Sequence, residues 1–202
     1  MPIGLLKRFN TTSSQSSSES TLVCPGYPIE LFPGYTNPED FSVILSVLAD
    51  DDAEVRTQRG ELYMAMRGKR RKTLYDCYGF PIVNVRRKRN SLLGQYEVFD
   101  GEGSSELLLT ISSQWSWGGS KMTVSMINWN KEHIQLTVKG NILDRHTKVF
   151  FDNVEVGRID TRLPKKTNSI CRESYTLSSA AYVDVVLMVV ISLCLNDRYR
   201  EG

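Results

Sequence analysis

The chain has 202 residues, of which 41% are hydrophobic and 24% are charged, and its formal net charge is +2. These values are ordinary for a globular protein with one domain and a sizeable core. The total charge is too small to indicate a nucleic-acid-binding protein by itself. Any electrostatic argument therefore depends on where the charges lie along the chain.

The first part of the chain divides into a polar tail and a proline-rich lead-in. Residues 10–20 are nearly all Ser, Thr, Gln and Glu, which predicts a disordered tail over residues 1–20 and one folded domain over residues 21–202. Four prolines and two glycines then interrupt the stretch CPGYPIELFPGYTNP. This punctuation excludes a regular helix or a central strand, so we expect an extended segment that lies across the domain.

From Phe41 the hydrophobic pattern takes a period of two. Short runs rich in β-branched and aromatic residues follow one another as FSVILSVL, ELYMAM, KTLYD, PIVNVRR, GQYEVF, ELLLTIS, KMTVSMI, HIQLTVK, KVFF, VEVGRI and YTLS. Turn residues separate many of these runs, and no helical period lies between them. The pattern predicts a mainly β fold, an antiparallel barrel or sandwich. We interpret residues 50–54, DDDAE, as a solvated connection that holds at most one helical turn.

The last apolar run, Val185 to Leu195, is interrupted only by Ser192. It is too short for a membrane-spanning helix, which needs about 20 such residues, and longer than a usual buried strand. The flanks favour a helix over about residues 181–199, with Ser178 or Ser179 as its cap and Asp184 near its positive end. A helix that is apolar on every face must be surrounded by protein. We therefore expect it to fill the inside of a β-barrel.

These features resemble the LURP-one-related proteins. The resemblance rests on RKTLYDCYGFPIVNVRRK, on LLGQYEVFDGEG, on YTLSSAAYVDVVLMVVISLCLNDRYRE and on the lead-in CPGYPIEL. It implies a tubby C-terminal-like fold: a closed antiparallel β-barrel of about twelve strands around a central hydrophobic C-terminal helix. Two related groups, the tubby domains and the phospholipid scramblases, imply phosphoinositide binding and lipid movement respectively. Plant members of the family are associated with pathogen defence.

Motifs for catalysis or for a bound cofactor are not found. The sequence has no nucleophile elbow, no phosphate-binding P-loop and no zinc-protease motif. Its two histidines, His133 and His146, adjoin expected strands and suit surface positions or ordinary hydrogen bonds. The four cysteines are far apart and lack zinc spacing. We expect no enzyme activity, no cofactor and no metal.

The most informative charges form two runs that flank one expected hairpin. They are Lys69, Arg70, Arg71 and Lys72 before its turn, and Arg86, Arg87, Lys88 and Arg89 after it. Strand alternation would bury half of each run if it lay in mid-strand, so the runs belong at strand ends or in loops. Antiparallel pairing of KTLYD with PIVNVRR would gather them at one end of the hairpin.

Three functions remain open for such a basic cluster. The leading hypothesis is a cytoplasmic domain, peripheral at membranes, that binds anionic phospholipid headgroups such as phosphoinositides, or an acidic partner, through these eight side chains. The alternative is a protein-interaction scaffold in stress or defence signalling. A scramblase-like membrane protein is the third hypothesis. Salt bridges to carboxylates such as Asp50 to Asp52 or Glu97, a nuclear location and RNA binding also suit basic runs, although nucleic acid is the less favoured partner.

Overall fold

The computed structural model of this protein describes residues 21–48, 50–69, 71–89, 91, 94–103, 105–114, 120–141, 146–162 and 171–201. The tail expected over residues 1–20 lies outside these residues. A short 3₁₀ turn, η1 (Pro33–Tyr35), precedes the strands, and one α-helix, α1 (Val185–Glu201), follows them. The strands are β1 (Phe41–Leu48), β2 (Ala53–Thr57), β3 (Leu62–Arg67), β4 (Arg71–Asp76), β5 (Pro81–Arg87), β6 (Gln95–Asp100), β7 (Leu107–Gln114), β8 (Ser120–Ile127), β9 (His133–Asn141), β10 (His146–Phe151), β11 (Val154–Arg162) and β12 (Cys171–Ser179).

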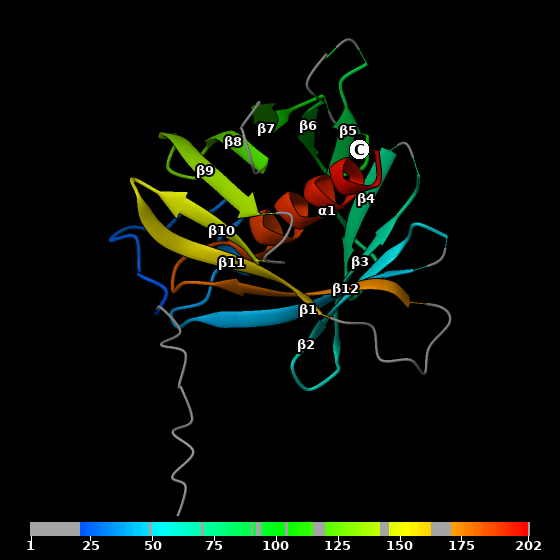
Figure 1. The fold of residues 1–202 in the computed structure, drawn as a ribbon, viewed down its shortest axis with the longest axis horizontal. Helices are drawn as coiled ribbons and strands as arrows, with labels where there is room; N and C mark the ends of the chain where they lie inside the picture. The colour runs from blue at the N-terminus through cyan, green and yellow to red at the C-terminus, as the bar shows by residue number, and fades with distance from the viewer. Residues whose placement is uncertain are drawn as a thin grey trace, which may run out of the picture.

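The strands form one closed antiparallel barrel, as the sequence predicts. Each strand pairs with its neighbours in the chain, and β12 pairs with β1 to close the ring (Figure 1). The period-two pattern explains this arrangement: in β1, Val43, Leu45 and Val47 are buried while the residues between them are partly exposed. Alternate side chains of each strand therefore line the inside of the barrel.

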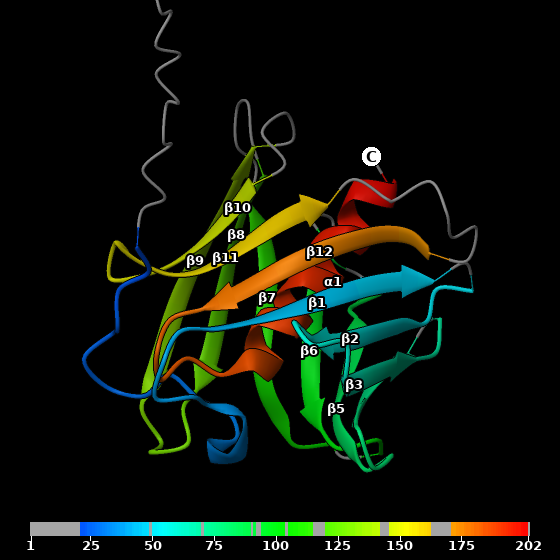
Figure 2. The same ribbon diagram turned by 90° about the horizontal axis from the view of Figure 1, so that it is seen from below.

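The helix α1 runs through the inside of the barrel (Figure 2). Every residue from Val185 to Asn196 is buried, which confirms that the apolar run fills the barrel and has no wet face. The helix packs tightly against β11 at Gly157. A Cβ atom added to this glycine would lie 2.6 Å from both Sδ and Cε of the buried Met188, so any other residue there would require the end of that side chain to shift.

The start of α1 differs from the expected one. Ser178 and Ser179 lie in β12, and the helix begins at Val185 with the carboxylate of Asp184 as its cap. Oδ1 of Asp184 accepts a 2.7 Å hydrogen bond from the Val186 N–H, as an N-cap does. The chain first has to turn out of β12, and Tyr182 with its φ of 62° lies in that turn. A serine still inside a strand cannot cap the helix.

The proline-rich lead-in lies across the barrel end at which α1 begins, as expected. Ile29 forms a parallel bridge to Val183, and Ile29 and Leu31 are buried. The backbone N–H groups of Leu31 and Phe32 each donate a 3.0 Å hydrogen bond to Oδ2 of Asp184. One carboxylate thus fastens the lead-in to the first turn of the helix.

The stretch from Asp50 to Glu54 also differs from its interpretation as a connection. Asp50 to Asp52 form a turn, but Ala53 and Glu54 already belong to β2, a strand that the sequence reading missed. Glu54 and Arg56 lie on the outer face of β2 and pair with each other at 2.8 Å, while Ala53 and Val55 are buried. Buried and outward-facing residues do alternate in β2, but Glu54 and Arg56 make the segment look like a charged connection.

The direction of α1 distinguishes the two ends of the barrel. At the helix-start end lie the lead-in and the turns β2–β3, β4–β5, β6–β7, β8–β9 and β10–β11. At the helix-finish end, Asp197 in the last turns of α1 contacts Lys72 at the start of β4. Because the strands alternate in direction, the runs that flank the β4–β5 hairpin both lie at this helix-finish end.

Candidate functional site

The two predicted basic runs meet at the helix-finish end. In the register of β4 with β5, Arg71 lies directly opposite Arg86 and Lys72 lies opposite Val85. Arg86 and Arg87 are the last residues of β5, and Lys88 and Arg89 follow them in the next turn. Arg70 lies outside the described residues. The other seven candidates gather at one end of one hairpin.

These side chains border a cavity of about 1320 Å³, which we call the basic cavity. Its volume exceeds the roughly 300–1000 Å³ of usual small-molecule pockets, as expected of an open trough. Eight cationic side chains and two carboxylates face it, together with Val85, Ser91 and Tyr96. The cations are Lys69, Arg71, Lys72, Arg86, Arg87, Lys88, Arg89 and Arg200, and the carboxylates are Asp51 and Asp197. The cavity is therefore strongly positive.

Arg86 is held in place by its neighbours. Its guanidinium carbon lies 4.3 Å from the centre of the Phe99 ring, and its Nε donates a 2.6 Å hydrogen bond to Oδ1 of Asn84. The buried Asn84 in turn donates from Nδ2 to Oγ1 of Thr73 at 2.9 Å. Arginine stacked on a ring and bonded to an amide keeps its orientation. The cavity thus has one cationic group that is set before any ligand arrives.

Lys72 is turned inward rather than exposed at a strand end. Only 7% of the residue is accessible, and its ammonium group forms an ion pair with Asp197 of α1. A buried ammonium needs such a partner, because it has lost its hydration. Lys72 therefore ties β4 to the end of the helix, and it is the least available of the candidate cations for binding a ligand.

Asp51, Asp197 and Arg200 also border the cavity, and of these the sequence raised Asp51 as a salt-bridge partner for the basic runs. Asp51, in the β1–β2 turn, accepts a 2.6 Å hydrogen bond from Nη1 of Arg200 and lies 3.2 Å from Nη1 of Arg172. The hydrogen bond from Arg200 holds the pKa of the Asp51 carboxyl below its ordinary value. These contacts join segments more than a hundred residues apart, so no local pattern announces them.

The remaining cations differ in their partners. Lys88 lies 3.5 Å from Glu97, a salt bridge that the sequence raised as an alternative. The side chains of Lys69, Arg71 and Arg89 form no hydrogen bond or ion pair with any residue that the structure describes. Nearby in the last turn of α1, the buried Nη1 of Arg198 also has no hydrogen-bond partner within the described chain. Positive charge at this end thus exceeds what its own carboxylates neutralise.

The two histidines do not line the basic cavity. Within the ranges that the structure describes, no group of three His, Cys, Asp or Glu side chains is placed to hold a metal ion. His146 contacts Asp160 through Nδ1 at 2.5 Å, and His133 is exposed at the start of β9. α1 does not have the length and hydropathy that a membrane span requires, and it is the one α-helix among the described residues.

Comparison with known proteins agrees with the fold. The LURP-one-related family profile matches residues 42–196. An X-ray structure of a protein from Arabidopsis thaliana superimposes with a TM-score of 0.61 at 20% sequence identity, over 83% of this chain and 96% of that chain. An identity this low supports likeness of fold alone. No curated protein matches the sequence.

Proposed function

The chain belongs to the LURP-one-related family, and we propose that its basic cavity binds the phosphorylated headgroups of anionic phospholipids, phosphoinositides above all. One observation carries this proposal: eight cationic side chains face a single cavity of about 1320 Å³, and three of them, Lys69, Arg71 and Arg89, have no partner among the described residues. Unpaired guanidinium and ammonium groups in a hollow favour a ligand with several negative oxygens.

The electrostatics of the cavity come from side chains and not from the backbone. The carbonyl end of a helix repels anions, and α1 ends here. Arg198 and Arg200 in its last turn offset that negative end. The chain therefore needs a dense cluster of Arg and Lys to hold an anion at this place, and we expect the binding to weaken as salt rises.

Binding rather than catalysis suits these residues. Arginine stays protonated at any ordinary pH and donates in a fixed fork, which matches phosphate oxygens but moves no proton. Arg86 is already oriented by Phe99 and Asn84, so part of the ordering cost is met before the ligand arrives. We propose that the protein works in the cytoplasm as a peripheral membrane protein, with the helix-finish end toward the anionic leaflet.

Vesicle binding tests this function. Lipid vesicles of phosphatidylcholine, with and without phosphatidylinositol bisphosphate, are sedimented with the protein at low and high salt. We expect binding only with the phosphoinositide and at low salt. Arg71→Glu should raise the dissociation constant about 30-fold, since each cation near an anionic leaflet contributes about 1 kcal/mol and reversal costs about twice that.

The matched control is Arg59→Glu, which makes the same change in net charge in the exposed β2–β3 turn of the opposite end. It should bind like the original protein. Inositol trisphosphate and inorganic phosphate, titrated without lipid, distinguish a headgroup site from a site for free phosphate. Equal loss of vesicle binding in the Arg71 and Arg59 variants would refute the proposal, because net charge and not the cavity would then govern binding.

A further inference from the structure

Exposed apolar side chains gather at the helix-start end, opposite the basic cavity. Within the described residues, every large hydrophobic side chain that is exposed lies in the lead-in, in the turns of this end, at a strand end beside those turns, or in the connection from β12 to α1. They are Val23, Tyr27, Leu62, Tyr78, Phe80, Leu107, Ile127, Trp129 and Tyr182. Single exposed apolar residues need no explanation, but nine at one end of a barrel indicate a contact surface.

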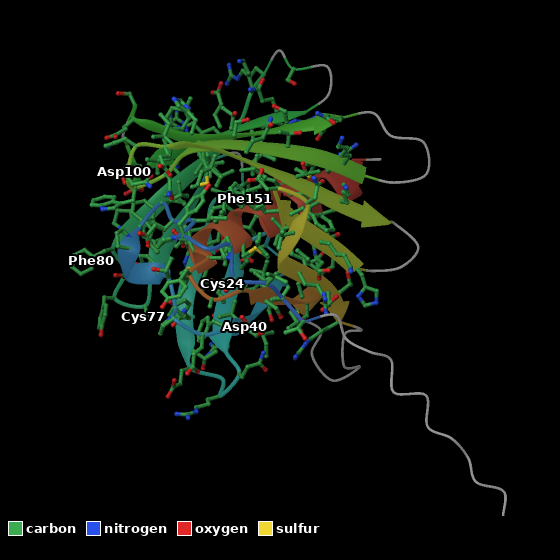
Figure 3. The ribbon with its side chains drawn as sticks, turned by 90° about the vertical axis from the view of Figure 1, so that its left-hand side faces the viewer. Cys24, Asp40, Cys77, Phe80, Asp100 and Phe151 are labelled. Carbon is green, nitrogen blue, oxygen red and sulfur yellow. The ribbon has the colours of Figure 1, made fainter. Side chains whose placement is uncertain are left out.

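The most exposed of these side chains stand on the β4–β5 turn. Tyr78 is 84% exposed and Phe80 is 69% exposed, and Figure 3 shows Phe80 projecting from the body of the protein. The turn that presents them is well bonded. Oδ1 of Asp76 accepts hydrogen bonds from the backbone N–H groups of Tyr78 at 2.9 Å and of Phe80 at 2.8 Å. Two aromatic rings are thus held out to solvent on an ordered backbone.

The connections of the helix-start end are rich in carboxylates. Glu102 of the β6–β7 turn accepts a 3.2 Å hydrogen bond from the hydroxyl of Tyr75, which lies in β4 just before the aromatic turn. Around the whole helix-start end, the described connections carry the carboxylates of Glu30, Glu39, Asp40, Glu61, Glu102, Glu106, Glu132 and Asp152, against the cations Arg59 and Lys131. The described connections of this end therefore carry more carboxylates than cations, opposite in sign to the basic cavity.

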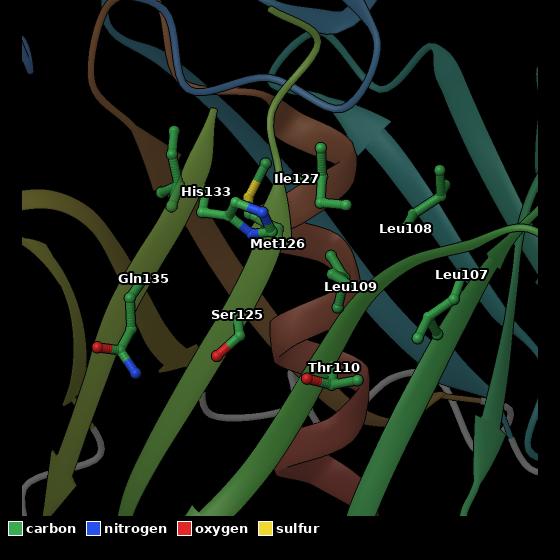
Figure 4. A pocket seen from close by; sticks show the side chains of 10 residues that line it. Leu107, Leu108, Leu109, Thr110, Ser125, Met126, Ile127, His133 and Gln135 are labelled. Carbon is green, nitrogen blue, oxygen red and sulfur yellow. The ribbon is translucent and has the colours of Figure 1, made fainter. Parts of the chain in front are cut away.

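A shallow apolar hollow adds to the apolar surface of this end. Its volume is about 350 Å³, and it lies over the first residues of β7, the last residues of β8 and the start of β9 (Figure 4). Leu107 and Ile127 border it and are themselves exposed. The hollow is bordered by Ile127 and His133, which flank the β8–β9 turn that carries the exposed Trp129.

We propose that the helix-start end is a docking surface for a cationic segment of a partner protein, with arginine side chains that stack on Tyr78 and Phe80. Charge complementarity selects this occupant, because carboxylates around exposed rings attract guanidinium groups both as ions and over the ring faces. The same carboxylates would be repelled by an anionic leaflet, so the rings are not placed to enter such a membrane. This inference does not depend on the lipid function of the basic cavity.

The test uses three labelled synthetic peptides on the full-length protein: an arginine–glycine repeat, its lysine counterpart and its glutamate counterpart. We expect the arginine peptide to bind more tightly than the lysine peptide, and the glutamate peptide not to bind. The double variant Tyr78→Ser/Phe80→Ser keeps every charge and should lose affinity for the arginine peptide about fivefold or more. Glu102→Gln/Glu106→Gln keeps the rings and should also weaken binding.

A matched control is Asp50→Asn, which removes one carboxylate from the exposed turn at the helix-finish end and should leave peptide affinity unchanged. Equal affinity of the original protein and the Tyr78/Phe80 variant would overturn the proposal and leave only diffuse charge attraction. Light scattering tests whether the occupant is a second copy of this chain: self-association that is lost with either Tyr78→Ser/Phe80→Ser or Arg71→Glu would replace the partner protein with a second copy. Sedimentation with uncharged vesicles tests a membrane as occupant: binding that depends on Tyr78 and Phe80 would replace the partner protein with a membrane.

Discussion

Asp184 joins the lead-in to the helix through one side chain. Its carboxylate caps α1 at Val186 and accepts hydrogen bonds from the N–H groups of Leu31 and Phe32 in the lead-in. It is completely buried. Burial raises the pKa of Asp184 to about 6, and the backbone donors oppose this shift only in part. The protonated form is therefore present in the folded protein at a pH where the unfolded chain is already ionised.

This shift predicts a pH dependence of stability. A carboxyl whose pKa is raised on folding stabilises the folded state most when the pH lies below its unfolded pKa, and that contribution is lost as the pH rises through about 6. The free energy of unfolding of the original protein, minus that of Asp184→Asn, should increase as the pH falls from about 7 to about 5. Urea unfolding at the two pH values measures it. A flat or opposite trend would contradict the assigned shift.

The sequence predicted which charged residues form the site better than it predicted the contacts that these residues make. Antiparallel pairing of KTLYD with PIVNVRR predicted that the two basic runs gather at one end of the hairpin, and in the observed register Arg71 lies opposite Arg86. The inward turn of Lys72 toward Asp197 was not predictable, because it depends on where the end of α1 lies inside the closed barrel. The same holds for the pair of Asp51 with Arg200, since their separation in sequence leaves no local signal.

At the scale of elements, apolar patterns were read correctly and element ends were not. The length and flanks of the apolar run favoured a buried helix over a membrane span or a strand, and the structure places it inside the barrel. β2 was missed because Glu54 and Arg56 alternate with only two buried residues after three aspartates. The helix start was misplaced because the turn after β12 takes its shape from contacts with the lead-in, such as the bond from the Tyr182 N–H to the Asn37 carbonyl.

The contact of Lys72 with Asp197 predicts how β4 and α1 hold together. Asp197→Leu alone leaves the ammonium group of Lys72 buried without a partner and should lower the free energy of unfolding by about 3 kcal/mol. Lys72→Met combined with Asp197→Leu replaces the pair by apolar groups and should recover most of that loss. Urea unfolding of the two single variants and the double variant forms the cycle. Additive losses would show that the pair is not coupled.

At the scale of the whole molecule, the barrel separates two opposite chemistries along the axis of its helix. The helix-finish end gathers cations around the basic cavity, and the helix-start end gathers exposed rings among carboxylates. This separation follows from topology, because connections between antiparallel strands alternate between the two ends. Under our two proposals, the protein would face an anionic leaflet with one end and present the other end to a cationic partner.

An NMR titration of amide shifts with soluble inositol trisphosphate tests most directly whether the basic cavity binds a phosphorylated headgroup. We expect shifts to change at Lys69, Arg71, Lys72 and residues 86–89, which border the basic cavity, and to stay unchanged in residues 76–81 at the other end. High salt should reduce these changes, as expected of an electrostatic site. Changes centred on the helix-start end, or no saturable change at all, would contradict the assignment of the basic cavity as a headgroup site.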